Sequence, residues 1–241
     1  MKNRLLFIVV TIFLSGLIQA KTLKVGVYSA YPHIFAVNEE ITGPAINYIE
    51  EALNQAGLKY EFKMIPIKRG LKQLENDKLD LLIGLAKTQE RQDRFSFIKT
   101  PVAISSPCLI TKKGNTLSKR QILELGGELL IPGQFITDKR VKELLKRFKI
   151  VSVHDRKPLK AMMSILTFKE DVYGYFQLCD ENFFNHYDFR TIPLFGLKTY
   201  YYIGHSRALN RVIVQKVNKA LKDLNTKGSD YSYYFKKFSS E

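Results

Sequence analysis

The sequence predicts an α/β fold built from two successive units, each a mainly parallel sheet covered by helices. Segments whose apolar residues alternate with polar ones, as in strands, take turns with segments whose apolar residues recur every three or four positions, as in helices. The order strand, helix, strand, helix, strand is typical of parallel sheets with crossover helices. This pattern starts again after a polar, glycine-containing stretch at 112–115, and a helical tail follows it.

The first unit shows the whole order within its opening sixty residues or so. Its expected strands and helices alternate over residues 23–27, 44–56, 60–64, 71–74 and 79–83. In the first strand, Leu23, Val25 and Val27 fall on one face. Pro44 suits the first position of the helix that follows, where a backbone N–H is not needed, and Gly57 suits its end. These elements predict a mainly parallel sheet with covering helices.

The second unit has shorter elements in the same style. Its expected strands are 129–131, 151–153 and 172–176, and its expected helices are 141–148 and 159–166. In the tail, an apolar stripe at 209–224 predicts a long helix that stops at Gly228, and aromatic residues at 231–238 predict a shorter one. We interpret these apolar stripes as core rather than as cofactor-binding surfaces.

The first twenty residues predict a secretory signal peptide, residues 1–20. Lys2 and Arg4 precede an apolar run over Leu5–Leu14, and small residues surround a predicted cut after Ala20. A retained membrane anchor is the alternative, but the apolar run is short for a span of about twenty residues. The sequence therefore predicts export to the periplasm.

The net charge of +15 narrows the classes of partner. Such a charge fits nucleic acid, an anionic membrane surface or an acidic ligand. Export argues against nucleic acid, and the basic residues are spread along the chain rather than gathered in one block. We therefore favour a solvated basic surface over a functional patch.

Catalytic, cofactor and metal motifs are not found in the sequence. It contains no Gly-x-Ser-x-Gly elbow, no paired-histidine zinc motif and no glycine-rich phosphate loop, and its four histidines lack ligand spacing. We expect no enzyme activity, no cofactor and no metal. Cys108 and Cys179 have no metal or redox spacing. In an exported chain they could form one disulfide, and the sequence leaves this open.

The most informative segment is 80–91. It places a loop with Gly84 and Ala86 at the C-terminal end of a predicted parallel strand, and open α/β sheets bind ligands outside such ends. Small residues let the backbone approach a ligand, and the planar fork of Arg91 suits a carboxylate. An exposed arginine near a helix start is the alternative interpretation.

The chain resembles the extracellular solute-binding proteins of family 3, the polar amino-acid type, from about Leu23 to Phe238. The matching segments are Leu23–Val27 with Tyr31-Pro32, Ala56-Gly57-Leu58, Lys78–Gly84, Thr88–Arg91, and Val217–Leu221 with Gly228, Tyr231 and Lys236-Lys237. The resemblance implies a two-lobe periplasmic-binding-protein type II fold with two hinge crossings. Residues 21–111 and 199–241 would form the first lobe, and 112–198 the second.

The resemblance also implies a ligand site in the cleft between the lobes, which closure buries. Arg91 would pair with a ligand carboxylate, Thr88 would support its loop, and Tyr28 and Tyr31 would line the pocket. The other residues expected to bind ligand are Arg69, Gly84, Ala86, Gln134, Phe135 and Phe176. Arg69 has an equal alternative as a solvated cation at a helix start.

The chain departs from the family pattern in the second lobe. Phe176 stands where the family usually has an aspartate for the ligand ammonium, although a small shift of alignment brings Asp180 near. A buried ammonium without a carboxylate partner is costly. The departure therefore favours a carboxylate or another anion over an α-amino acid, with Phe135 and Phe176 stacking on a flat or apolar part.

These observations predict a monomeric receptor that captures a small polar, carboxylate-bearing metabolite by lobe closure. It would deliver this ligand to the membrane permease of an ABC importer, without nucleic acid as a partner. A sensing module for a signalling receptor is the first alternative. A cyclohexadienyl-dehydratase-like enzyme acting on prephenate-like substrates and a basic adhesion protein without a ligand are the others.

Overall fold

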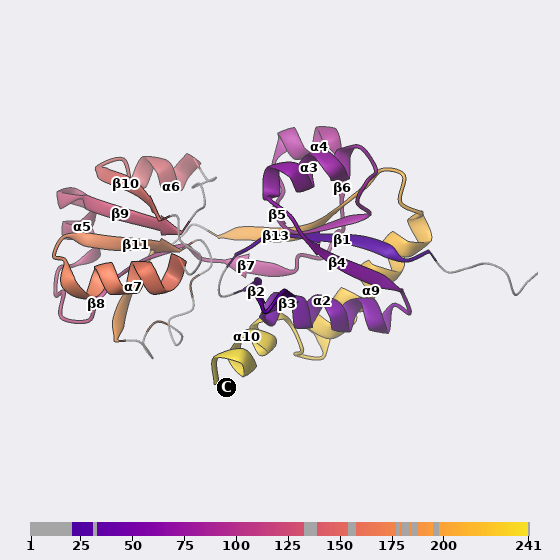
Figure 1. Cartoon of the computed structure of the whole chain (residues 1–241). Coiled ribbons are helices and arrows are strands. Elements are labelled where there is room, and N and C mark those ends of the chain that lie inside the picture. Colours follow the sequence, from indigo (N-terminus) through magenta and orange to yellow (C-terminus); the bar gives the residue numbers. More distant parts are fainter. Residues whose placement is uncertain are drawn as a thin grey trace, which may run out of the picture.

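Two β-sheets, each with helices beside it, form two lobes of the chain (Figure 1). The computed structural model describes residues 21–30, 33–132, 139–153, 158–176, 179, 184, 188–194 and 198–240. The predicted signal peptide lies outside these residues. No helix in the described ranges combines the length and the apolar character that a membrane span requires.

The first lobe contains a six-stranded sheet in the order β4-β1-β5-β13-β6, with β7 paired to β13. Its strands are β1 (Leu23–Val27), β4 (Tyr60–Met64), β5 (Leu81–Ala86), β6 (Ser96–Phe97), β7 (Ala103–Ser105) and β13 (Thr199–His205). Its helices are α2 (Pro44–Gln55), α3 (Ile67–Glu75), α4 (Gln89–Arg94), α9 (Arg211–Thr226) and α10 (Tyr231–Ser240). A separate hairpin joins β2 (Phe35–Val37) and β3 (Glu40–Thr42).

The second lobe contains a five-stranded sheet in the order β10-β9-β11-β8-β12. Its strands are β8 (Cys108–Lys112), β9 (Gly127–Pro132), β10 (Phe148–Val153), β11 (Val172–Phe176) and β12 (Phe189–Pro193). Its helices are α5 (Lys119–Leu125), α6 (Lys139–Leu144) and α7 (Pro158–Phe168).

Both sheets are mixed rather than uniformly parallel. In the first sheet, β1 pairs in parallel with β4 and β5, and β13 runs antiparallel to β5. In the second, β9 pairs in parallel with β10 and β11, and β8 runs antiparallel to β11 and β12. The parallel strands are those that the sequence pattern predicts. The antiparallel strands β8 and β13 lie next to the points where the chain passes between the lobes.

The chain passes between the sheets twice, from β7 to β8 and from β12 to β13. β8 begins at Cys108, before the predicted boundary at 112, and pairs within the second sheet. After the return, β13 begins at Thr199 and pairs within the first sheet. The assignment of residue ranges to lobes as independent domains stays a prediction.

Each sheet is buried on both faces. In the first lobe, residues of β1 pack with α2 and α9 on one face, while Leu74 of α3 packs with Leu82 and Phe95 on the other. In the second lobe, α7 covers one face, and α5 and α6 cover the other. Continuous burial of β11, from Val172 to Phe176, follows from this two-sided cover.

Local sequence explains how α2 is placed. Pro44 occupies its first turn, and Gly57 follows its last residues with a φ of 65°, a left-handed conformation that glycine adopts without strain. Its apolar stripe, with Ile46, Ile49 and Leu53, is buried against β1 and α9. Both expectations for the ends of this helix are confirmed.

The last helix, α10, contacts both lobes. Tyr231 packs beside Tyr48 of α2 and bonds to Nδ1 of His33 through its hydroxyl, all in the first lobe. Phe235 on the same helix is buried in the apolar cluster of the second lobe, which also contains Phe184. The helix therefore adds a noncovalent contact between lobes to the two covalent crossings.

A disulfide joins Cys108 and Cys179, a pairing that the sequence leaves open. Cys108 begins β8 directly after the first crossing, and Cys179 follows β11, its neighbour in the sheet. The bridge therefore fastens two adjacent strands of the second lobe at the end of each that lies near the crossing.

Candidate functional site

The candidate site lies at the C-terminal ends of the neighbouring strands β1 and β5. Tyr28 follows β1 directly, and its hydroxyl donates a hydrogen bond to the carbonyl of Gly84 on β5 at 2.6 Å. Arg91 comes from α4, just after β5, and its Nη1 donates to the carbonyl of Ala86 at 2.9 Å. The structure thus brings together Tyr28, Gly84, Ala86 and Arg91 at the edge of the sheet where open α/β folds bind ligands.

A bulge in β5 shapes this edge. Between Leu82 and Leu85, two residues of β5 stand opposite the single residue of β13 between Tyr202 and Gly204. Gly84 lies in the bulge with a φ of 79°, which a side chain would strain, and an added Cβ would lie 3.2 Å from the Tyr28 hydroxyl. A glycine is therefore needed at this position for the bulge and for the close approach of the Tyr28 hydroxyl. The sequence suggests instead that its small size serves the approach of a ligand.

Thr88 fixes the start of the helix that carries Arg91. Its Oγ1 accepts a hydrogen bond from the backbone N–H of Arg91 at 3.3 Å, as an N-cap residue does. The cap and the bond to Ala86 hold Arg91 at both its backbone and its side chain. Thr88 would therefore support the Arg91 loop by capping the start of α4.

Burial governs the electrostatics of the pair formed by Arg91 and Tyr28. Loss of hydration lowers the pKa of the half-buried Arg91 guanidinium, while Tyr28, Glu90 and Tyr201 nearby act in the opposite sense. Its ordinary pKa is so high that the group stays charged at pH 7. Burial likewise raises the pKa of the Tyr28 hydroxyl to about 12, against a smaller lowering by Arg91. The pair therefore presents a cation and a neutral phenol.

The Arg91 guanidinium keeps hydrogen-bond donors for a ligand. A guanidinium has five N–H donors in a planar fork. Within the described part of the chain, its side chain makes one hydrogen bond, to Ala86. A carboxylate that reaches the remaining donors can form a bidentate, charge-assisted pair, which is stronger than a bond between neutral groups.

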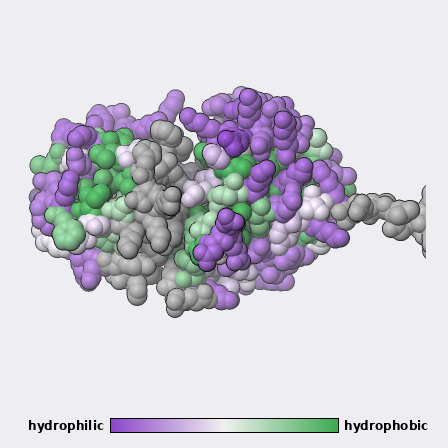
Figure 2. Space-filling view, viewed as in Figure 1, coloured by the Kyte–Doolittle hydropathy of each residue, from purple (hydrophilic) through white to green (hydrophobic). Residues whose placement is uncertain are grey.

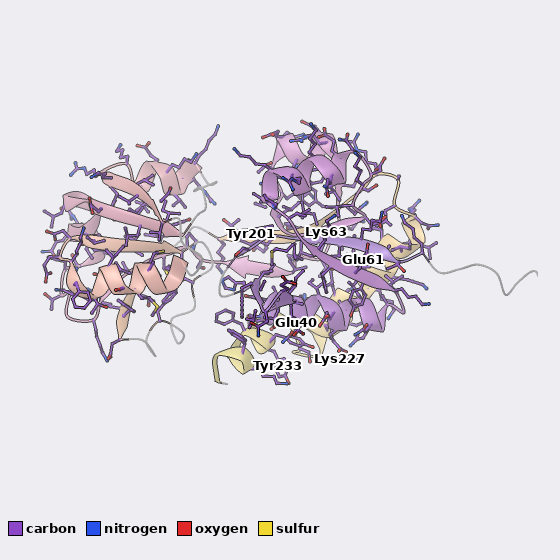
Figure 3. All side chains as sticks on the ribbon, in the orientation of Figure 1. Glu40, Glu61, Lys63, Tyr201, Lys227 and Tyr233 are labelled. Atoms are coloured by element: carbon purple, nitrogen blue, oxygen red, sulfur yellow. A yellow bond between two sulfur atoms is a disulfide. The ribbon has the colours of Figure 1, made fainter. Side chains whose placement is uncertain are left out.

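Tyr201 belongs to the candidate site although the sequence does not point to it. It stands opposite Ala86 in the pairing of β13 with β5, is buried, and lies close enough to Arg91 to affect its pKa. Figure 3 shows it near the start of β13, on the side of the first lobe that faces the second. On the same strand, the buried Thr199 Oγ1 has no hydrogen-bond partner among the described residues. Only the run of three tyrosines at 200–202 marks this strand in the sequence.

The other predicted site residues differ in where the structure places them. Phe176 is only 4% exposed and packs against Phe184 in the second-lobe cluster, so its ring is not presented to a ligand as expected. The cause is the burial of β11 on both faces. Arg69 is exposed on the first turn of α3, which follows β4 at the ligand edge of the sheet. Tyr31, Gln134 and Phe135 lie outside the described residues.

A metal centre has no support in the described ranges, where no three His, Cys, Asp or Glu side chains gather. Arg91 is a charged group at the site whose side chain is held by a bond to the sheet. The arrangement can bind an anion by charge and hydrogen bonding.

Comparison with known families agrees with this arrangement. The model of the bacterial extracellular solute-binding proteins of family 3 matches residues 23–239. The chain belongs to this family. Membership implies a location outside the cytoplasm and a role in binding a solute.

Relatives of this family 3 protein include the L-cystine-binding protein TcyJ of Bacillus subtilis strain 168. The two are 34% identical over 121 residues, which cover 48% of this chain and 44% of that protein. The family 3 protein thus matches less than half the length of that curated relative.

Solved structures share the two-lobe type II periplasmic-binding-protein fold. An ancestral cationic amino acid solute-binding protein, AncCDT-1, has a TM-score of 0.74 at 19% identity, over 93% of this chain and 98% of that one. A second structure of AncCDT-1, described as a precursor of cyclohexadienyl dehydratase, has a TM-score of 0.70 at 18% identity and the same coverage. AbpA of Streptococcus pneumoniae bound to L-arginine has a TM-score of 0.70 at 19% identity, over 91% and 94% of the two chains.

The hydroxyl of Tyr28 provides a test that depends on pH. An unfolded tyrosine titrates near 10 and the folded one at about 12, so the folded state keeps its proton longer. Its contribution to stability is complete below pH 10 and falls by about 1.4 kcal/mol per pH unit as the pH rises toward 12. We expect Tyr28→Phe to be about 1 kcal/mol less stable at pH 7, for the lost bond to Gly84, and nearly equal to wild type at pH 11. Urea unfolding at both pH values measures this, and an unchanged deficit at pH 11 would contradict it.

Proposed function

We propose that this family 3 protein captures a small, amino-acid-like metabolite through its carboxylate and delivers it to the permease of an ABC importer. The observation that carries this proposal is Arg91, held by Ala86 at the ligand edge of the first sheet with donors left over. Closure of the second lobe over this edge would bury the ligand.

The surroundings of Arg91 support a ligand of this kind. Tyr28 and Tyr201 lie near the guanidinium and supply polarisable rings with hydroxyl groups, while Lys87 lies 5.8 Å above the ring of Tyr202. Cystine and arginine, the ligands named for TcyJ and AbpA, both carry a carboxylate. A carboxylate is thus the ligand group for which the described side of the site is best equipped.

The proposal also includes export of the protein and binding of the ligand without chemical conversion. We infer that residues 1–20 are removed during export and that the mature protein works as a monomer in the periplasm. Among the described residues, the carboxylate that acts on the pKa of Arg91 belongs to Glu90, which is exposed on α4. Among the described residues around Arg91, no carboxylate is therefore seen in position for proton transfer to a bound substrate.

A thermal-shift screen of the mature protein tests the proposal. We expect carboxylate-bearing metabolites, amino acids among them, to raise the unfolding temperature, and decarboxylated counterparts, such as agmatine in place of arginine, to leave it unchanged. A ligand at 100 times its dissociation constant stabilises the folded state by about 2.7 kcal/mol. A panel in which no carboxylate gives a shift would refute the proposal. Conversion of a prephenate-like compound by the same preparation would favour an enzyme.

A further inference from the structure

A basic groove runs between α5 and α6 on the second lobe. It has a volume of about 1070 Å³ and opens widely to solvent. The positively charged side chains that line it are Lys119, Arg120, Lys139, Arg140, Lys146 and Arg147. Figure 2 shows hydrophilic residues along the upper rim of the second lobe, where Figure 1 draws α6. The general basic surface expected from the sequence thus includes a concentrated patch.

Positive charge exceeds negative charge in this groove. Among the described residues that line the groove, six cations and two carboxylates, Glu124 and Glu143, give a net charge of +4. Arg120 pairs with Glu124 and Lys146 pairs with Glu143, each within one turn and with exposed side chains. Exposed ion pairs of this kind contribute little to stability. They therefore do little to offset the repulsion between the cations that α5 and α6 bring into the groove. An anionic partner in the groove would relieve this repulsion.

Apolar residues lie within and beside the same patch. Leu123 and Leu144 line the groove, and Leu125 at the end of α5 is 69% exposed. The Nη1 of Arg147 donates to the carbonyl of Glu124 at 2.5 Å, which keeps a cation next to Leu125. Cations beside an exposed leucine suit the boundary between phosphate headgroups and acyl chains. A soluble polyanion would use the cations and leave the leucine without a role.

We propose that this groove binds the anionic phospholipid surface of the membrane. The candidate ligand site around Arg91 is in the other lobe, so membrane contact leaves that site free. Attraction of this kind is reversible and weakens with salt, because it acts near the surface and is screened over about a Debye length. The groove would keep the protein close to the bilayer in which a permease lies.

Vesicle sedimentation of the exported protein tests this proposal. We expect partition onto vesicles that contain phosphatidylglycerol, loss of partition at high salt, and little partition onto phosphatidylcholine alone. The double change Lys139→Glu with Arg140→Glu should weaken partition by about tenfold or more. The matched control is Lys216→Glu with Lys222→Glu, two exposed lysines of α9 in the first lobe, which changes the net charge equally. An equal loss in this control would overturn the proposal, since net charge alone would then drive binding.

Leu125→Ser separates a membrane from a soluble polyanion. We expect this change to lower partition onto vesicles several-fold and to leave retention on immobilised heparin unchanged. Partition equal to that of wild type would overturn the membrane assignment in favour of a soluble polyanion. Thermal shift with an amino acid checks the fold of every variant. This thermal shift depends on Arg91 and not on the groove, whereas vesicle partition depends on the groove and not on Arg91. Failure of the proposed function and failure of this inference are therefore distinguishable.

Discussion

Replacing Arg91 with alanine is expected to weaken ligand binding by about 100-fold or more. The guanidinium is half-buried, is fixed by Ala86, and offers its remaining donors at the ligand edge of β5. Truncating one partner of a buried, hydrogen-bonded charge pair costs about 2–5 kcal/mol, and about 2.7 kcal/mol corresponds to 100-fold in affinity. Isothermal titration with the strongest carboxylate from the screen measures the loss.

Two further variants show whether this loss belongs to the site. Arg91→Lys keeps the charge and loses the planar fork, so we expect an intermediate loss of roughly tenfold. Arg94→Ala is the matched control on the same helix, because Arg94 pairs with Glu75 and Glu90 instead of the sheet edge. We expect its affinity to match wild type. Unchanged affinity in Arg91→Ala would mean that the protein recognises its ligand through other residues.

Periodic elements could be predicted from the sequence, and strands defined by distant pairing could not. Strands β1 and β4 could be predicted because their residue types alternate, with apolar residues at Leu23, Val25 and Val27 and at Tyr60, Phe62 and Met64. β13 contains a run of tyrosines without alternation, and its place in the middle of the first sheet depends on pairing with β5, more than a hundred residues earlier. No local pattern reports such a pairing, so the lobe architecture came from the family resemblance.

The same distinction applies to the candidate site. Tyr28, Thr88 and Arg91 follow strands directly in sequence, so a prediction of strand ends also finds them. Tyr201 joins them only through the pairing of β13 with β5. Phe176 was expected to face a ligand from its aligned position alone, whereas both faces of its strand are covered in the structure. Alternation carries no information about direction in a strand that is buried on both sides.

Removing the Cys108–Cys179 disulfide is expected to lower the free energy of unfolding by about 4 kcal/mol. The two cysteines are 71 residues apart, and a cross-link over a loop of this length restricts the unfolded chain by about that amount. The double variant Cys108→Ala with Cys179→Ala removes the link without burying a new hydroxyl at Cys108, which is fully buried. Urea unfolding of the variant, beside the wild-type protein with and without reductant, measures the effect.

Reduced wild type and the double variant should agree, apart from the packing lost where Cys108 enters the second-lobe cluster. A variant that unfolds at the same urea concentration as the oxidised wild type would contradict the prediction. Because both cysteines belong to the second lobe, hydrogen exchange should quicken first in β8 and β11. Equal acceleration in β1 and β5 would instead mean that the two lobes unfold as one cooperative unit, as the contact of Phe235 on α10 with the second-lobe cluster allows.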